Sequence, residues 1–183
     1  MTIVSDVDDV LCDLQSTVIN MFNERYNTNY SLEDFTDYNV ENILPLQESI
    51  AMKEIYGENG LYKTIKPIPG AQDGLQKLVD AGHQVYLVSD AIPKTYGEKI
   101  KWLNHFFPFI DNSHIIAMKH KQLLRCDVMI EDNLHTLLSG VHYNRICFDH
   151  PWNRYVRDWV YDIYRCSNWN EIVDVVKQIN ERE

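Results

Sequence analysis

The chain has 183 residues, of which 45% are hydrophobic and 24% are charged, which suits one α/β domain with a modest insertion and argues against disorder. Its formal net charge of −10 argues against binding to a polynucleotide or an anionic membrane, because neither polyanion would release counterions to it. The sequence has no basic-then-apolar leader and no apolar run near the roughly 20 residues of a membrane span, so we expect a cytoplasmic protein without a membrane partner.

Short apolar runs alternate with helical patterns along the chain. The apolar runs lie at residues 2–5, 84–88, 115–118, 128–130, 145–148 and 163–166. The helical patterns between them lie at residues 71–81, 96–107, 134–138 and 168–180. Because the runs are short, often β-branched and apolar on both faces, they predict buried parallel strands with crossover helices. We therefore expect an α/β fold, a Rossmann-like parallel sheet flanked by helices.

The segment between the first two strands is far longer than one crossover helix requires. It contains helical patterns at residues 14–26 and 47–56 and a helical turn that begins at Ser31. A proline-rich turn at residues 67–70 returns the chain to the sheet. We therefore expect a core domain of residues 1–13 and 67–183, and a small helical cap of residues 14–66 over the carboxyl edge of the sheet.

Polar side chains follow four of the predicted strands where each strand ends. They are Asp6 with Asp8, Ser89 with Asp90, Glu131 with Asp132, and Asp149 with His150. Because ligands of an open parallel sheet bind outside the carboxyl ends of its strands, these groups should gather at one edge. Asp6 and Asp8 are two residues apart, so in an extended segment both point the same way. Together with Asp132 they form an all-oxygen acidic set, which selects a hard cation such as Mg²⁺.

Each of these acids also has a simpler explanation when it is considered alone. Any of them could be a strand-end cap or a solvated turn residue, and Asp132 could cap the helix that begins near residue 134. The coincidence of acidic residues at two strand ends favours a site over these explanations. The seven histidines form no HxxxH or HExxH pattern, so a zinc site is not expected.

Four motifs in chain order resemble those of the haloacid dehalogenase superfamily. The run DVDDVL at residues 6–11 resembles the first motif, and Ser89 at the end of a strand fits the second. Lys121, ten residues before Glu131, fits the third motif, and the pair Glu131-Asp132 resembles the acidic fourth motif.

Within that superfamily the chain is most similar to the 5'(3')-deoxyribonucleotidase branch. The resemblance rests on DVDDVLCDL at the start, the position of the helical cap, PIPGA at residues 67–71, the pair Glu98-Lys99 with Trp102, CDVMIEDN at residues 126–133 and FDHPWNR at residues 148–154. It implies hydrolysis of deoxynucleoside or nucleoside monophosphates to nucleoside and phosphate.

The resemblance also implies a role for each motif residue. Asp6 would be the nucleophile that forms an aspartyl phosphate, and Asp8 the general acid and base. Mg²⁺ would be held by Asp6, the backbone carbonyl of Asp8 and Asp132, with Glu131 in support. The residues implied to contact the phosphate are Ser89, Asp90, Lys99 and Lys121, of which Ser89 and Lys121 complete the catalytic set.

The cap is expected to supply the pocket for the rest of the substrate, through Leu14, Phe35 and Tyr38. Three positions depart from the usual pattern of the family: Asp9 stands where the best-studied members carry glycine, Glu131 replaces the usual aspartate, and Leu14 stands where an aromatic residue often lines the base pocket. Two alternatives remain open, namely a phosphatase for another small ester, such as a sugar phosphate or a 3'-phosphate end, and a non-catalytic binding protein. Assembly into a homodimer is compatible with the sequence.

Overall fold

The computed structural model describes residues 1–182 and contains one parallel sheet of six strands. The strands are β1 (Thr2–Ser5), β2 (Gln84–Ser89), β3 (Ile115–Ala117), β4 (Val128–Glu131), β5 (Asn144–Phe148) and β6 (Ile163–Cys166). They are hydrogen-bonded in the order β3-β2-β1-β4-β5-β6. The predicted α/β fold is confirmed. The order changes direction at β1, so the carboxyl ends of β1, β2 and β4 lie side by side.

Seven α-helices connect and cover these strands in the part of the chain that the structure describes. They are α1 (Leu14–Tyr26), α2 (Leu46–Tyr56), α3 (Ala71–Asp80), α4 (Tyr96–Phe106), α5 (Leu134–Ser139), α6 (Asp158–Tyr161) and α7 (Trp169–Asn180). Every helix that the sequence predicts is present, whereas the short α6 was not expected. None of the helices within residues 1–182 has the length and apolar character that crossing a membrane would require.

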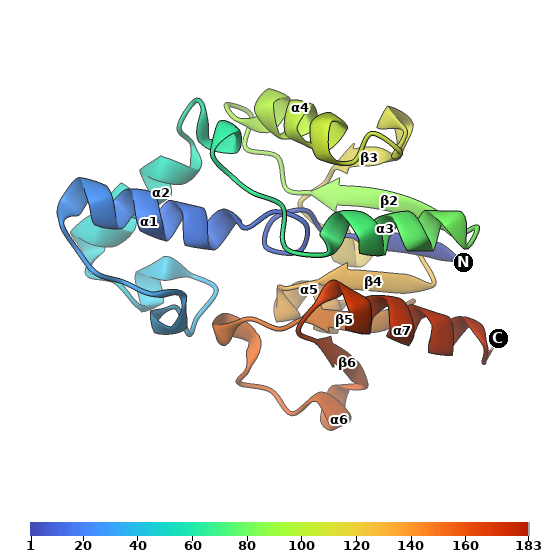
Figure 1. The fold of residues 1–183 in the computed structure, drawn as a ribbon. Helices are drawn as coiled ribbons and strands as arrows, with labels where there is room; N and C mark the ends of the chain where they lie inside the picture. The colour runs from blue at the N-terminus through green and yellow to red at the C-terminus, as the bar shows by residue number, and fades with distance from the viewer. Residues whose placement is uncertain (183) are drawn as a thin grey trace.

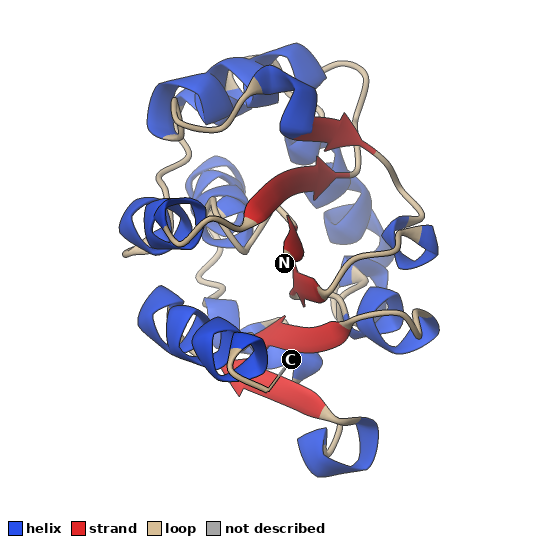
Figure 2. Ribbon diagram, turned by 90° about the vertical axis from the view of Figure 1, so that its right-hand side faces the viewer, coloured by secondary structure: helices blue, strands red, loops and turns tan. Residues whose placement is uncertain are grey.

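Each face of the sheet buries its own set of side chains. Neighbouring residues such as Ile3 and Val4 alternate between two hydrophobic clusters, as strand geometry requires. Helices α3, α4 and α7 bury residues in the cluster that contains Ile3, whereas Leu137 of α5 belongs to the cluster that contains Val4. Figure 2 shows the strands between these two layers of helices.

The segment of residues 14–66, called the insertion below, lies beyond one end of the sheet (Figure 1). It carries α1, α2 and the short 3-10 turns η1 (Leu32–Asp34), η2 (Val40–Asn42) and η3 (Leu61–Lys63). Its buried residues Phe22, Met52 and Ile55 belong to the same hydrophobic cluster as Ile3 and Leu87 of the sheet. The insertion is therefore packed onto the sheet through a continuous apolar core.

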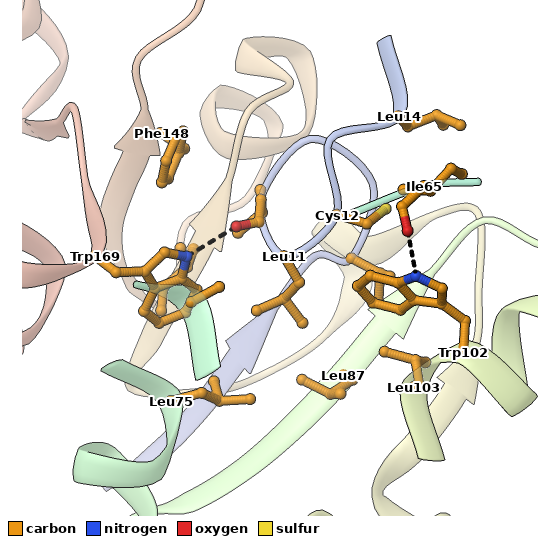
Figure 3. Close-up of a cluster of buried hydrophobic side chains, with 14 of the residues drawn as sticks. Leu11, Cys12, Leu14, Ile65, Leu75, Leu87, Trp102, Leu103, Phe148 and Trp169 are labelled. Carbon is orange, nitrogen blue, oxygen red and sulfur yellow. Dashed lines mark hydrogen bonds between the residues drawn. The ribbon is translucent and has the colours of Figure 1, made fainter. Parts of the chain in front are cut away.

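Two buried tryptophans fix the chain where it leaves and re-enters the sheet domain (Figure 3). The indole Nε1 of Trp169 donates to the carbonyl oxygen of Val10 at 2.9 Å, in the turn that follows β1. The indole Nε1 of Trp102 donates to the carbonyl oxygen of Ile65 at 3.0 Å, at the end of the insertion. Because a buried carbonyl without a partner is costly, these bonds hold both connections in place.

Candidate active site

The turn after β1 places the first two motif aspartates at the carboxyl edge of the sheet. The amide of Asp6 donates to the carbonyl of Ile130 at 2.9 Å, which extends the pairing of β1 with β4 by one residue. Asp9 has a φ of 55°, in the left-handed region. This conformation explains why glycine suits the position, and aspartate is one of the few other residues that adopt it readily.

Three buried carboxylates meet at this edge. Asp6, Glu131 and Asp132 each offer one oxygen atom, and these atoms lie within 4.8 Å of one another. The side chains come from the ends of β1 and β4, and the residues are 5%, 1% and 3% exposed. Lys121 neutralises part of the negative charge of these carboxylates, because its Nζ lies 2.5 Å from Oδ2 of Asp6 and 2.6 Å from Oε2 of Glu131.

One lysine does not neutralise three carboxylates, and their proton affinities reflect this. Burial and the charge of Asp6 raise the pKa of Asp132 to about 7, and the same causes raise the pKa of Glu131 well above its ordinary value. Burial favours loss of the Lys121 proton, but Asp6 and Glu131 outweigh it and raise the pKa of Lys121. The cluster therefore favours an additional positive charge.

The donor set fits a hard divalent cation. Within residues 1–182, Glu131 Oε2 is a buried oxygen that receives no hydrogen bond of suitable geometry, although it lies near Lys121. In the same range, no backbone hydrogen bond outside the helices and strands ends on the Asp8 carbonyl oxygen. Carboxylate and carbonyl oxygens at this spacing are the ligands that Mg²⁺ prefers. Asp6, Asp132 and the Asp8 carbonyl are therefore available to hold such an ion.

Asp8 is held apart from this cluster by a second group of side chains. Its Oδ2 accepts from Nζ of Lys99 at 2.6 Å and from Oγ of Ser89 at 3.3 Å, and its Oδ1 accepts from the Tyr62 hydroxyl at 2.8 Å. Burial favours the neutral acid, but the Lys99 ammonium and these donors outweigh it and lower the pKa of Asp8.

Ser89 and Lys99 are buried side chains, whereas the residues of an open phosphate site would face the cavity. Both residues are 3% exposed, and Lys99 Nζ donates to Ser89 Oγ at 2.6 Å and to the Asp90 carbonyl at 3.0 Å. Neither residue lines the cavity described below. In this structure they contact Asp8 directly, so the prediction that they contact phosphate requires a rearrangement of these bonds.

The loop after β5 supports the acidic cluster from the other side. The indole Nε1 of Trp152 donates to Asp132 Oδ2 at 2.9 Å, and the side-chain Nδ2 of Asn153 donates to the backbone carbonyl oxygen of Asp132 at 2.9 Å. His150 Nε2 donates to the Asp9 carbonyl at 2.7 Å. The N-terminus of α5 is capped by Asn133, so the alternative that Asp132 is its cap is wrong.

A cavity of about 560 Å³ joins the acidic cluster to the insertion. Its walls include most of the residues predicted for the site, namely Asp6, Asp8, Asp90, Lys121, Glu131 and Asp132 from the sheet domain and Leu14, Phe35 and Tyr38 from the insertion. Phe35 is 1% exposed, whereas Tyr38 is 55% exposed. Gln15, Tyr56 and Trp152 also line the cavity and were not among the predicted site residues, although Trp152 lies in the FDHPWNR run at residues 148–154 that contributes to the resemblance.

The fold is that of hydrolases of the haloacid dehalogenase superfamily. A hydrolase of that family from Deinococcus radiodurans has a similar fold, with a TM-score of 0.65 and 14% sequence identity over 98% of this chain and 96% of its own. The sequence pattern of the family described as 5' nucleotidase, deoxy (pyrimidine), cytosolic type C protein matches residues 1–182. The chain belongs to this family, and it is a phosphoric monoester hydrolase of the nucleotidase type.

Individual relatives agree with this assignment. The chain is 28% identical over 172 residues to the 5'(3')-deoxyribonucleotidase of Bacillus subtilis. The aligned region covers 93% of this chain and 95% of the relative. The 5'(3')-deoxyribonucleotidase of Bacillus phage SPbeta matches with the same identity and coverage. The similarity therefore extends through the insertion as well as the sheet domain.

Proposed function

We propose that this protein is a Mg²⁺-dependent 5'(3')-deoxyribonucleotidase, which hydrolyses deoxynucleoside or nucleoside monophosphates to nucleoside and phosphate. The observation that carries the proposal is the buried trio of Asp6, Glu131 and Asp132 with Lys121, at one side of a cavity shared with the insertion. The family and the named relatives support the substrate class.

The chemistry begins at Asp6. We propose that a carboxylate oxygen of Asp6 attacks phosphorus, the ester P–O bond breaks, and an aspartyl phosphate forms. Once its bond to Lys99 rearranges and it takes up a proton, Asp8 protonates the leaving alkoxide, and the resulting Asp8 carboxylate then takes a proton from water. That water attacks phosphorus, which releases inorganic phosphate and regenerates Asp6. Asp8 lines the cavity two residues from Asp6, which suits this alternating role.

The surrounding charges make the attack of one anion on another feasible. Asp6, Asp132 and the Asp8 carbonyl would hold Mg²⁺, which supplies positive charge against the phosphate dianion when it is bound. Lys121 adds a buried ammonium beside Asp6. Ser89, Asp90 and Lys99 would contact the phosphate once their bonds to one another and to Asp8 rearrange.

The insertion is the proposed cap that selects the ester. Leu14, Phe35 and Tyr38 add apolar and aromatic surface to the wall of the same cavity, which suits the flat face of a nucleobase. The volume of about 560 Å³ falls within the range of cavities that bind small molecules.

The test is phosphate release from a panel of nucleoside 5'- and 3'-monophosphates, ribo and deoxy, with Mg²⁺ and with a chelator. The proposal predicts Mg²⁺-dependent turnover that favours deoxynucleotides. Turnover of a generic aryl phosphate or a sugar phosphate without turnover of any nucleotide would support the catalytic site and reject the nucleotide as its substrate. Absence of turnover of every ester, with metal bound, would contradict the proposal as a whole.

A further inference from the structure

Gln15 is a buried amide that the proposed chemistry does not use. It lies in the first turn of α1, is 8% exposed, and lines the cavity. Its backbone N–H donates to Asp9 Oδ1 at 2.8 Å, which ties the start of α1 to the turn that carries Asp6 and Asp8. Its side chain is therefore placed by the same turn that places the candidate nucleophile.

The orientation of the Gln15 amide is fixed by a residue from the other helix of the insertion. The hydroxyl of Tyr56, the last residue of α2, donates to Oε1 of Gln15. With that oxygen occupied, the amide presents Nε2 and its two hydrogens as the free end. Within residues 1–182 no hydrogen bond uses Gln15 Nε2, and the side chain lines the cavity. A donor fixed in this way at a cavity wall requires an acceptor there, which a bound ligand supplies when it displaces solvent.

The other polar side chains that the insertion contributes to the cavity wall are exposed or already paired. Lys53 forms an ion pair with Glu41 at 2.8 Å, and Asp37 accepts hydrogen bonds from the backbone N–H of Asn39 and the side chain of Asn42. Tyr38 and Asn39 are exposed. Among these polar side chains, Gln15 is thus the buried one with a donor that no described hydrogen bond uses.

The neighbours of Gln15 indicate which part of a substrate it meets. Leu14, Phe35 and Tyr56 line the same cavity and offer apolar or aromatic surface. The phosphate is accounted for by the cluster around Asp6 and Lys121 on the sheet domain. A donor on the insertion would therefore meet the organic part of the ester, where an acceptor oxygen is the matching group.

We propose that Gln15 is a specificity-determining residue whose Nε2 donates a hydrogen bond to an acceptor oxygen of the nucleoside, either a carbonyl of the base or an oxygen of the sugar. Tyr56 and Asp9 act as positioning residues that orient and anchor this amide. The inference rests on the proposed nucleotide substrate, and it names one contact by which that substrate is recognised.

The test compares kcat/KM of the wild type and Gln15→Met for three substrates: deoxyuridine 5'-monophosphate, deoxyribose 5-phosphate and a generic aryl phosphate. Methionine keeps the length of the side chain and removes its donor. We expect the ratio of kcat/KM for the nucleotide to kcat/KM for the aryl phosphate to fall about fivefold or more, the effect of one lost hydrogen bond. Gln47→Met, an exposed glutamine of α2, is the matched control, and its ratio should equal that of the wild type.

The substrates distinguish the two sources of the oxygen. If deoxyribose 5-phosphate loses as much relative activity as the nucleotide, Gln15 reads the sugar; if it loses none, Gln15 reads the base. Tyr56→Phe, which removes the hydroxyl that orients the amide, should lower the same ratio by a smaller factor. This second variant carries the test if Gln15→Met folds poorly.

Two results would overturn the inference, and only the second of them would also reject the proposed function. A wild type that hydrolyses nucleotides, together with variants whose substrate ratio is unchanged, rejects the contact at Gln15 and leaves the proposed function intact. A wild type that hydrolyses the aryl phosphate and no nucleotide rejects the proposed function and the inference together.

Discussion

Asp8 is connected to side chains from four different parts of the chain. Lys99 of α4, Tyr62 of the insertion, Cys12 and Ser89 at the end of β2 all contact its carboxylate. Lys99 is the charged member of this group and is 3% exposed. Breaking a buried pair from one side leaves an uncompensated charge, so Lys99 and Asp8 should depend on each other energetically.

Removal of both partners should therefore destabilise the protein less than the sum of the two single removals. We expect Lys99→Met to lower the free energy of unfolding by about 3 kcal/mol, because it leaves Asp8 without its cation. The double variant Lys99→Met with Asp8→Asn should lose clearly less than the sum of the two single variants. Urea denaturation of the four proteins measures this, and additivity within about 0.5 kcal/mol would contradict the pairing.

Asp132 stores electrostatic strain that should appear as a dependence of stability on pH. Its pKa is about 7 in the folded chain and 3.8 in the reference state, so the folded state binds the proton more tightly. Between pH 4 and pH 7 the unfolded state loses this proton first, and stability falls as pH rises. An asparagine at this position has no proton to lose.

We therefore expect Asp132→Asn to become progressively more stable than the wild type as pH rises from about 4 to about 7 in the presence of a chelator. Above that range the difference in melting temperature should stay constant. Saturating Mg²⁺ should raise the melting temperature of the wild type more than that of the variant, because the variant lacks a ligand. A difference that is independent of pH would show that the Asp132 carboxyl is not strained.

At the scale of elements, Gly74 marks a close approach between α3 and α7. A Cβ on Gly74 of α3 would lie 2.7 Å from a ring carbon of Trp169 in α7, and Trp169 also holds the turn after β1 through Val10. A Cβ on Gly97 of α4 would meet no heavy atom within 4 Å outside its own helix backbone, so this glycine provides a matched comparison.

Alanine should have opposite effects at these two helical glycines. Gly74→Ala should destabilise by about 1–3 kcal/mol because of overpacking against Trp169. Gly97→Ala should be neutral or stabilise by up to about 1 kcal/mol, since alanine is the better helix former. Thermal and urea unfolding of both variants checks this, and equal effects would contradict the close contact between α3 and α7.

The bounds of most helices and strands could be predicted from the local pattern of apolar residues in the sequence. The run at residues 2–5 coincides with β1, and the helical pattern at residues 14–26 coincides with α1, because burial on both faces or on one stripe leaves a clear periodicity. The short α6 did not follow from pattern, because a four-residue helix spans little more than one turn and shows no periodicity.

The site was predictable only in part. Strand ends and motif spacing identified Asp6, Lys121, Glu131 and Asp132, because parallel strands bring their carboxyl ends to one edge. The contact of Lys99 with Asp8 joins residues 91 positions apart, and the orientation of Gln15 depends on Tyr56, 41 positions away. Such pairs depend on tertiary packing and leave no local trace in the sequence.

At the scale of the whole molecule, the sheet and the insertion share one hydrophobic cluster. Because this apolar core is continuous through both parts, we expect a single cooperative unfolding transition. Circular dichroism and tryptophan fluorescence should give the same midpoint in urea, since the tryptophans Trp102 and Trp169 lie at the junctions of the two parts. Separate midpoints would indicate that the insertion unfolds independently.

The central claim is that Asp6 and a divalent cation together hydrolyse a nucleotide phosphate ester. The most direct measurement is phosphate release from a deoxynucleoside 5'-monophosphate by the wild type and by Asp6→Asn, each with Mg²⁺ and with a chelator. We expect turnover only for the wild type with Mg²⁺, and a loss of at least about 1,000-fold in the variant, since removal of a covalent nucleophile removes its reaction path. Comparable turnover by Asp6→Asn, or turnover by the wild type in chelator, would contradict the account.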